Sequence, residues 1–161
     1  GGTGEEIIIG SSAADTITGG PGVDTITGGA GNDIINGGTG ADVIVVAAQS
    51  AGGVDSITGL AINSDKIKHG LTENIAAYTD DTASDYSAQA NLQAAALASA
   101  GAVETALNGS WATIGDVATF TYDSKTYAVI STANATSYST ADILVELVGG
   151  VTGFDINEFI T

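Results

Sequence analysis

GGPGVDTIT GGAGNDIIN GGTGADVIV, residues 19–45, is one nine-residue unit written three times without a break. The unit reads G-G-x-G-x-D-x-U-x, where U is a large aliphatic residue. Two altered copies precede it. Residues 1–9 carry Glu6 at the aspartate position, and residues 10–18 lose most of their glycines but keep Asp15 and Ile17. A short fixed period rarely arises by chance, so this stretch is the strongest signal in the chain.

The unit divides into a turn and a strand. Glycines at positions 1, 2 and 4 allow a sharp turn with positive φ. The last three residues predict a short strand whose side chains alternate between two faces. One repeat makes half a coil, so each repeat stacks on the next but one at roughly 4.8 Å. The middle residues of the strands then point into the protein: Ile8, Ile17, Ile26, Ile35 and Ile44.

The same stacking brings carboxylates together. Asp24 is expected near Asp42 and Glu6, and Asp15 near Asp33. Two carboxylates about 4.8 Å apart repel by about 3–4 kcal/mol at an effective dielectric constant of 20. No Lys, Arg or His occurs in residues 1–65 to offset this repulsion. A hard divalent cation would. Calcium accepts six to eight carboxylate and carbonyl oxygens, whereas magnesium requires a near-octahedral site and retains its waters.

These nonapeptides resemble the RTX (repeats-in-toxin, haemolysin-type) calcium-binding repeats of secreted bacterial proteins. The resemblance implies a parallel β-roll with several calcium ions in its turns. It implies that Asp15, Asp24, Asp33 and Asp42 are carboxylate ligands, with Glu6 at the equivalent place in the first repeat. Ala13 replaces the fourth-position glycine and weakens the second turn. The other expected site positions lie in the turns: Gly19, Pro21, Gly22, Gly28, Ala30, Gly31, Gly37, Thr39 and Gly40. A Gly- and Asp-rich loop without metal is the alternative.

Beyond the repeats, residues 53–60 read G-x-D-x-I-x-x-L and are followed by D-K-I at residues 65–67. This arrangement resembles the strand and turn after the last repeat of many RTX proteins. It implies that Asp55, Asp65 or both close the last calcium site, unless Asp65 only begins a turn. Aliphatic residues of this segment are expected to cap the open end of the roll: Ile57, Leu60, Ile62 and Ile67.

The remainder of the chain has no repeat. Residues 85–107 are rich in alanine and predict one or two helices, with Ser84 or Asp85 as the N-cap. Residues 117–130 alternate around Asp123-Ser124-Lys125 and predict a hairpin. A further strand is expected at 143–148, after Asp142, which could cap or ligate. Phe120, Tyr122 and Tyr127 are expected in the core. The predicted fold is mainly β, with a parallel β-roll at 1–69 and a smaller α+β domain at 70–161.

Composition excludes several classes of function. The 161 residues carry a formal charge of −16, with 19 acidic residues against three lysines, so nucleic acid and anionic membrane are poor partners. No apolar stretch reaches transmembrane length. There is no Cys and no HExxH motif, and the single histidine, His69, has no flanking triad motif. His69 is expected to be a solvated loop residue. The chain itself is therefore not expected to be an enzyme.

The last residues, with Glu158, Phe159 and Ile160, resemble an uncleaved type I secretion signal, although an ordinary final strand would have the same pattern. The residues from about 120 onward also resemble the C-terminal domain of bacterial surface proteins that carry such repeats. We expect a secreted or surface-attached module of a Gram-negative-type bacterium. Its expected partners are calcium and the type I secretion apparatus, and it could assemble with copies of itself. It would belong to a surface layer, matrix filament or adhesin. The alternative is the tail of a secreted hydrolase or toxin whose catalytic domain precedes Gly1.

Overall fold

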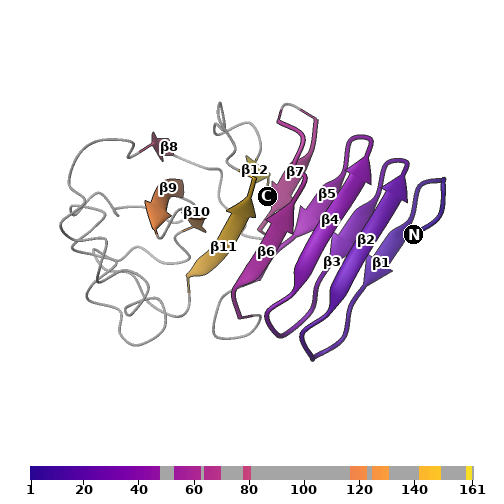
Figure 1. Ribbon diagram of the computed structural model, residues 1–161, viewed down its shortest axis with the longest axis horizontal. Helices are drawn as coiled ribbons and strands as arrows, with labels where there is room; N and C mark the ends of the chain where they lie inside the picture. Colours follow the sequence, from indigo (N-terminus) through magenta and orange to yellow (C-terminus); the bar gives the residue numbers. More distant parts are fainter. Residues whose placement is uncertain are drawn as a thin grey trace.

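The computed structural model describes residues 1–47, 53–62, 64–69, 78–80, 117–122, 125–130, 142–149 and 159–160. Every regular element within these ranges is a β-strand. The strands form two sheets (Figure 1), and the prediction of a mainly β protein built on a parallel roll is confirmed.

The first sheet contains the strands of the odd-numbered repeats and their continuation. All its neighbours pair in parallel, and the central isoleucines are in register: Ile8 with Ile26, Ile26 with Ile44, and Ile44 with Ile67. In spatial order the five strands are β1 (Ile7–Ile9), β3 (Thr25–Thr27), β5 (Val43–Val45), β7 (Lys66–Lys68) and β12 (Phe159–Ile160).

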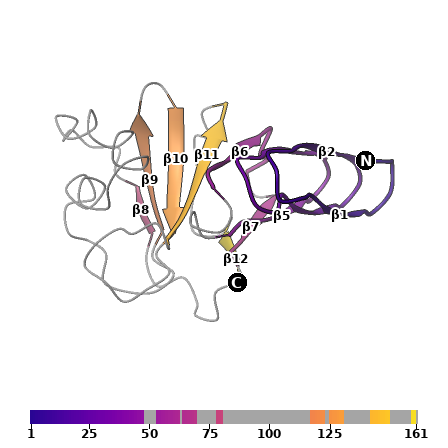
Figure 2. The same cartoon turned by 90° about the horizontal axis from the view of Figure 1, so that it is seen from below.

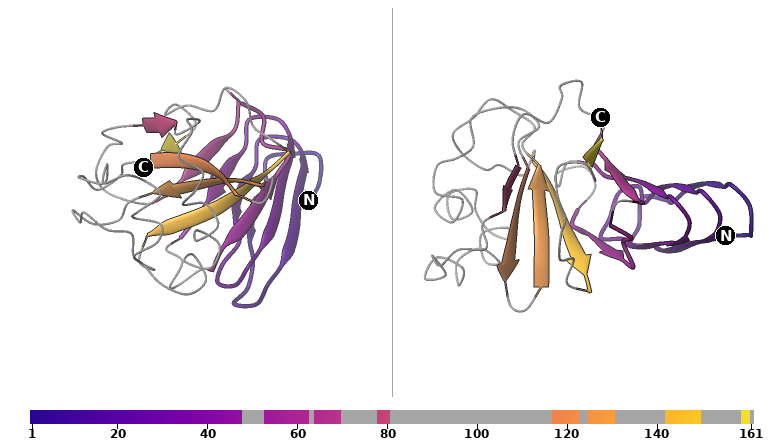
Figure 3. Two further views of the ribbon diagram at one scale, coloured as in Figure 1. Left: turned by 60° about the vertical axis from the view of Figure 1, so that its left-hand side comes forward. Right: turned by 90° about the horizontal axis from the view of Figure 1, so that it is seen from above.

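The second sheet begins with the even-numbered repeats and extends beyond them. Its first four strands pair in parallel, the next two pairings are antiparallel, and the last is parallel. In spatial order the seven strands are β2 (Thr16–Pro21), β4 (Ile34–Thr39), β6 (Asp55–Thr58), β11 (Ile143–Val148), β10 (Lys125–Ile130), β9 (Val117–Tyr122) and β8 (Tyr78–Asp80). Figure 3 shows β9, β10 and β11 spreading out from the end of the roll farthest from the N-terminus.

The core of the roll lies between the two sheets. Figure 2 shows the repeats as flattened coils with one sheet on each side. Full burial of an isoleucine side chain stabilises a fold by roughly 1.5–3 kcal/mol, so the columns of isoleucine are the main apolar contribution. Five isoleucines of β3 to β7 are completely buried between the sheets, namely Ile26, Ile35, Ile44, Ile57 and Ile67. Leu60 and Ile62 pack against them, as expected of a cap.

Strands from the end of the chain extend both sheets of the roll. In β11, Leu147 is in register with Ile57, and its side chain is 1% exposed. In β12, Phe159 is in register with Ile67. Strands β11 and β12 begin 98 and 114 residues after Val45, where the last repeat ends, and thus serve as the next coil of the roll.

Predictions for residues 70–161 have mixed outcomes. The hairpin is confirmed, since β10 pairs with β9 in antiparallel orientation, with Tyr127 opposite Phe120. The strand at 143–148 is confirmed as β11. Tyr127 is buried, as predicted, whereas the side chains of Phe120 and Tyr122 lie outside the described residues. The helices predicted at 85–107 also lie outside them. The described part of this region consists of strands that join the sheets of the roll, which does not support a C-terminal α+β domain. The boundary at residue 70 stays a prediction.

Candidate metal centre

The acidic residues at the sixth position of the repeats, together with two aspartates that follow the repeats, form two hydrogen-bonded ladders that run along the roll. In each ladder the backbone N–H of an acidic residue donates to a carboxylate oxygen, Oδ1, of the acidic residue one coil further on, at N···O distances of 2.8–3.1 Å. The first carboxylate ladder consists of Glu6, Asp24, Asp42 and Asp65, and the second of Asp15, Asp33 and Asp55. The neighbours predicted from the nine-residue period are confirmed.

Most of these carboxylates are buried. Asp24 and Asp42 are 0% exposed, Asp33 is 1% exposed, and Asp55 and Asp65 also belong to the interior. Carboxylates are almost never fully buried unless they are paired with a cation or coordinate a metal. No Lys, Arg or His side chain occurs among residues 1–65 to pair with them.

One oxygen of each central carboxylate lacks a partner. The Oδ2 atoms of Asp24, Asp33 and Asp42 are buried and accept no hydrogen bond from the described residues. Glu6 Oε2 is likewise buried and accepts no hydrogen bond from the described residues. A buried polar atom without a partner costs about 1–3 kcal/mol, and more when it is charged. Three such atoms in three consecutive complete repeats are places where a cation would be stabilised.

Backbone oxygens surround these unpartnered atoms. A Cβ placed on Gly19 would collide with both Asp24 Oδ2 and the carbonyl oxygen of Gly37, one coil further on. On Gly37 it would collide with the Asp42 carboxylate, and on Gly28 with that of Asp33. The first glycine of each repeat therefore leaves a space lined by oxygen that a side chain would fill.

The other turn glycines have a conformational role. Positions 2 and 4 of the three complete repeats have φ values between 108° and 147°, the region that side chains rarely adopt. A Cβ on Gly38 or Gly40 would also collide with the carbonyl oxygen of Gly20 or Gly22 below. Positive φ at these positions confirms the turn predicted from the sequence. The third-position residues share the turn, with Pro21 in register with Thr39 and the Ala30 N–H bonded to the Ser11 carbonyl.

Two carboxylates of the ladders differ from the central three. Asp15 Oδ2 accepts hydrogen bonds from the Ser11 N–H at 2.7 Å and the Ser11 hydroxyl at 2.9 Å. These bonds hold the pKa of Asp15 below its usual range. Asp65 Oδ2 accepts from the Ala61 N–H at 2.7 Å. The Asp65 N–H in turn donates to the Ala61 carbonyl, so Asp65 lies at the end of a turn that begins at Ala61.

Burial shifts the ionisation of two ladder residues. Burial raises the pKa of Asp55 to about 6, with the neighbouring Asp33 carboxylate adding to the effect and the Asp33 N–H opposing it. Burial also raises the pKa of Asp42. The hydrogen bond from the Asp24 N–H lowers this pKa, and the negative charges of Asp65 and Asp24 raise it further. Both shifts express the cost of gathering negative charge away from water.

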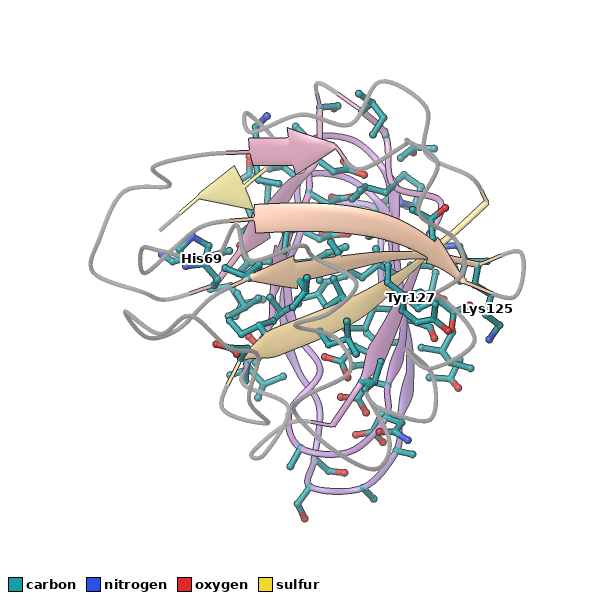
Figure 4. The ribbon with its side chains drawn as sticks, turned by 90° about the vertical axis from the view of Figure 1, so that its left-hand side faces the viewer. His69, Lys125 and Tyr127 are labelled. Carbon is teal, nitrogen blue, oxygen red and sulfur yellow. The ribbon has the colours of Figure 1, made fainter. Side chains whose placement is uncertain are left out.

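The prediction that His69 is a solvated loop residue is wrong, and the part played by Ser11 was not predicted. His69 is only 4% exposed, and burial lowers its pKa, so it is not a solvated loop residue. Figure 4 shows it well apart from Lys125 and Tyr127. Ser11 could have been recognised, because it occupies the second position of its repeat, where the complete repeats have glycine. Asp142, directly before β11, is buried, and its proposed capping or ligating role stays a prediction.

The donor set of the turns fits calcium. Across the described ranges, no three Asp, Glu or His side chains converge on one point, so a bound cation must also use backbone carbonyls. Carboxylate plus carbonyl oxygen is the set that calcium accepts, and no nitrogen or sulfur ligand for a transition metal lies in the turns.

No helix in the described part is long and apolar enough to span a membrane.

Comparison with known proteins agrees with this geometry. A family model described as the RTX calcium-binding nonapeptide repeat (4 copies) matches residues 1–35 and 9–44. None of the curated proteins matches the chain.

Among solved structures, the chain resembles the AlgE6R3 subunit of the Azotobacter vinelandii mannuronan C5-epimerase. The TM-score is 0.58 at 21% identity, over 99% of this chain and 75% of that one. The AlgE6R2 subunit of the same epimerase gives a TM-score of 0.35 at 16% identity, over 95% of this chain and 91% of that one. The first likeness shows a shared fold. Residues 1–44 of this chain are RTX nonapeptide repeats, and calcium is the ion that these repeats bind.

Proposed function

We propose that the chain is an extracellular, non-catalytic module that folds when calcium binds to its roll. The observation that supports this most directly is the set of buried, unpartnered Oδ2 atoms of Asp24, Asp33 and Asp42. These three carboxylates, with turn carbonyls such as that of Gly37, are the proposed ligands. Glu6, whose Oε2 also lacks a partner, is proposed as a ligand at the N-terminal end of its ladder.

The calcium ion would supply the positive charge that the ladders lack. Without it, carboxylates held one coil apart repel each other by several kcal/mol in total, which is comparable with the whole stability of a small domain. In the folded state, the isoleucine columns and the positive-φ glycines hold the ligand oxygens in place. Binding free energy then becomes folding free energy. Extracellular calcium modules bind at about 10⁻⁴–10⁻³ M, far above the free calcium of a cell interior.

Export in an unfolded state follows from this dependence. Without calcium, the acidic, Gly-rich repeats repel one another and stay unfolded, which suits passage through a narrow channel. The proposed type I signal includes Phe159 and Ile160, which form β12 against β7 in the folded protein. The signal would therefore be free for recognition before folding and paired with the roll afterwards.

Two parent proteins are compatible with such a module. A surface layer, matrix filament or adhesin is favoured by the lack of a catalytic constellation in the sequence. A secreted enzyme is favoured by the structural neighbour, because that protein is a subunit of an epimerase. Calcium-dependent sheets or fibres of the purified chain, seen by electron microscopy, would support the first. Sequence upstream of Gly1 that encodes a catalytic domain would support the second.

A calcium titration followed by far-UV circular dichroism tests the folding mechanism. We expect a cooperative change from coil to β structure in calcium, no such change at equal magnesium concentrations, and several ions retained after dialysis. The unaltered chain is compared with Asp33→Asn. This substitution keeps the size of the side chain but removes a central charge, so it should weaken calcium binding. Full β structure in chelator with no bound ion would contradict the proposal.

A further inference from the structure

The second repeat closes its turn without any cation. In this repeat Ser11 stands where the complete repeats have Gly20, Gly29 and Gly38. Its N–H and its hydroxyl both donate to Asp15 Oδ2, at 2.7 Å and 2.9 Å. The equivalent Oδ2 atoms in the three complete repeats accept no hydrogen bond from the described residues. The difference coincides with the change from glycine to serine.

A third hydrogen bond fixes the direction of the serine hydroxyl. The Ala13 N–H donates to Ser11 Oγ at 3.1 Å, so an acceptor lone pair of Oγ faces Ala13. The single hydroxyl hydrogen is then available for Asp15. Ala13 itself occupies the fourth position, which is glycine in the complete repeats. Both departures from the repeat pattern thus take part in one small hydrogen-bonded turn.

This turn supplies what a cation would supply. Two donors aimed at one carboxylate oxygen stabilise its negative charge and use the lone pairs that a metal ion would need. A calcium ion at Asp15 Oδ2 would have to displace both donors, whereas at Asp24, Asp33 and Asp42 it would displace none. At the other end of the roll, Asp65 Oδ2 is also occupied by a backbone donor, the Ala61 N–H at 2.7 Å.

We propose that the second turn, residues 10–15, is a calcium-free turn in which Ser11 takes the place of the ion at Asp15. Resting on the proposed calcium function, this assigns Asp15 a structural role and begins the calcium sites of the second ladder at Asp33. The turn of the second repeat is then held by its own hydrogen bonds, and the number of ions is smaller than the number of acidic residues suggests.

A gain of binding provides the sharpest test. Ser11→Gly combined with Ala13→Gly restores the pattern of the complete repeats, and glycine is already accommodated at those positions elsewhere in the roll. We expect this variant to bind at least one more calcium ion than the unaltered chain, by isothermal titration calorimetry and by metal analysis. Ser12→Gly, at the variable third position, is the matched control and should leave the number unchanged.

The reverse test uses loss of binding. Asp15→Asn should leave the number of ions unchanged, whereas Asp33→Asn should lower it, with circular dichroism in saturating calcium verifying that each variant is folded. An ion lost with Asp15→Asn, or no ion gained with the two glycines, would overturn the inference and leave the proposed function standing. An unaltered chain that binds no calcium at millimolar concentration would overturn both.

Discussion

The backbone N–H of Asp42 donates to Oδ1 of Asp65 at 3.1 Å, although 23 residues separate the two. One coil earlier, the same bond joins Asp24 to Asp42 over 18 residues, at 2.9 Å. The ladder therefore continues through an insertion of five residues, the difference between 23 and 18. It does so because Ile44 and Ile67 remain in register within the sheet. Position in the coil, not spacing in the sequence, defines the ladder.

Gly37→Ala should remove a calcium site and destabilise the roll. The added Cβ would meet the Cβ and Cγ atoms of Asp42 at 2.9 Å, so the carboxylate must move out of the place where we expect the ion. Calorimetric calcium titration and thermal unfolding would measure both effects. Gly4→Ala is the control, since its Cβ has only an ordinary contact, 3.7 Å from Glu6 Oε1. Equal calcium binding by the two variants would contradict the assignment.

Ile57→Ala should be costly and Ile34→Ala nearly neutral. Ile57 is 0% exposed in the column between the sheets, and loss of a buried isoleucine side chain costs about 2–5 kcal/mol. Ile34 points outward and is 49% exposed, so truncation should change the free energy of unfolding by less than about 0.5 kcal/mol. Urea unfolding in saturating calcium would compare them. Similar losses would mean that the outer face of the sheet is covered by something else.

Acidification should favour folding in the absence of calcium. The folded-state pKa of Asp55 is raised to about 6 by burial, so between pH 4 and 6 the folded state binds a proton more readily than the unfolded state. This contribution to stability is present below the unfolded pKa and is lost as the pH rises through about 6. Circular dichroism in chelator should therefore show more β structure at pH 5 than at pH 7.

Asp55→Asn is the control for this pH effect. The amide keeps the size of the side chain but does not titrate, so the variant should depend less on pH over the same interval. A chelated protein that loses β structure on acidification, equally with and without Asp55, would refute the assignment of the effect to this carboxyl group.

Lys125→Met should have a small effect. Lys125 Nζ lies 3.1 Å from Glu146 Oε2, but the lysine side chain is 47% exposed, and exposed pairs contribute about 0.2–1 kcal/mol. Glu146 also accepts a hydrogen bond from the Ser56 hydroxyl at 3.1 Å, which links β11 to β6 on the outer face. We expect unchanged calcium stoichiometry and a slight, salt-dependent loss of stability by urea unfolding. A change in the number of bound ions would show that this face communicates with the turns.

The sequence alone determined the repeats, their turns and their ladders. Two nine-residue repeats make one coil, so each residue lies beside the residue 18 positions further along the chain. Ile17 therefore lies beside Ile35, and Asp24 beside Asp42, wherever the coil forms. Glycine at positions of positive φ and alternation in a three-residue strand are local properties. For these reasons the parallel roll and the acidic neighbours could be predicted without coordinates.

Only the tertiary structure decided how the roll ends and which carboxylates lack partners. The sequence of β11 has the composition of any buried strand, and nothing local shows that Leu147 would join the column of Ile57. Pairing over so many residues depends on which sheet edge is open and which apolar surface is uncovered, and neither is a property of one segment. The Ser11–Asp15 turn is local, but its meaning depends on comparison with the unpartnered oxygens of the other coils.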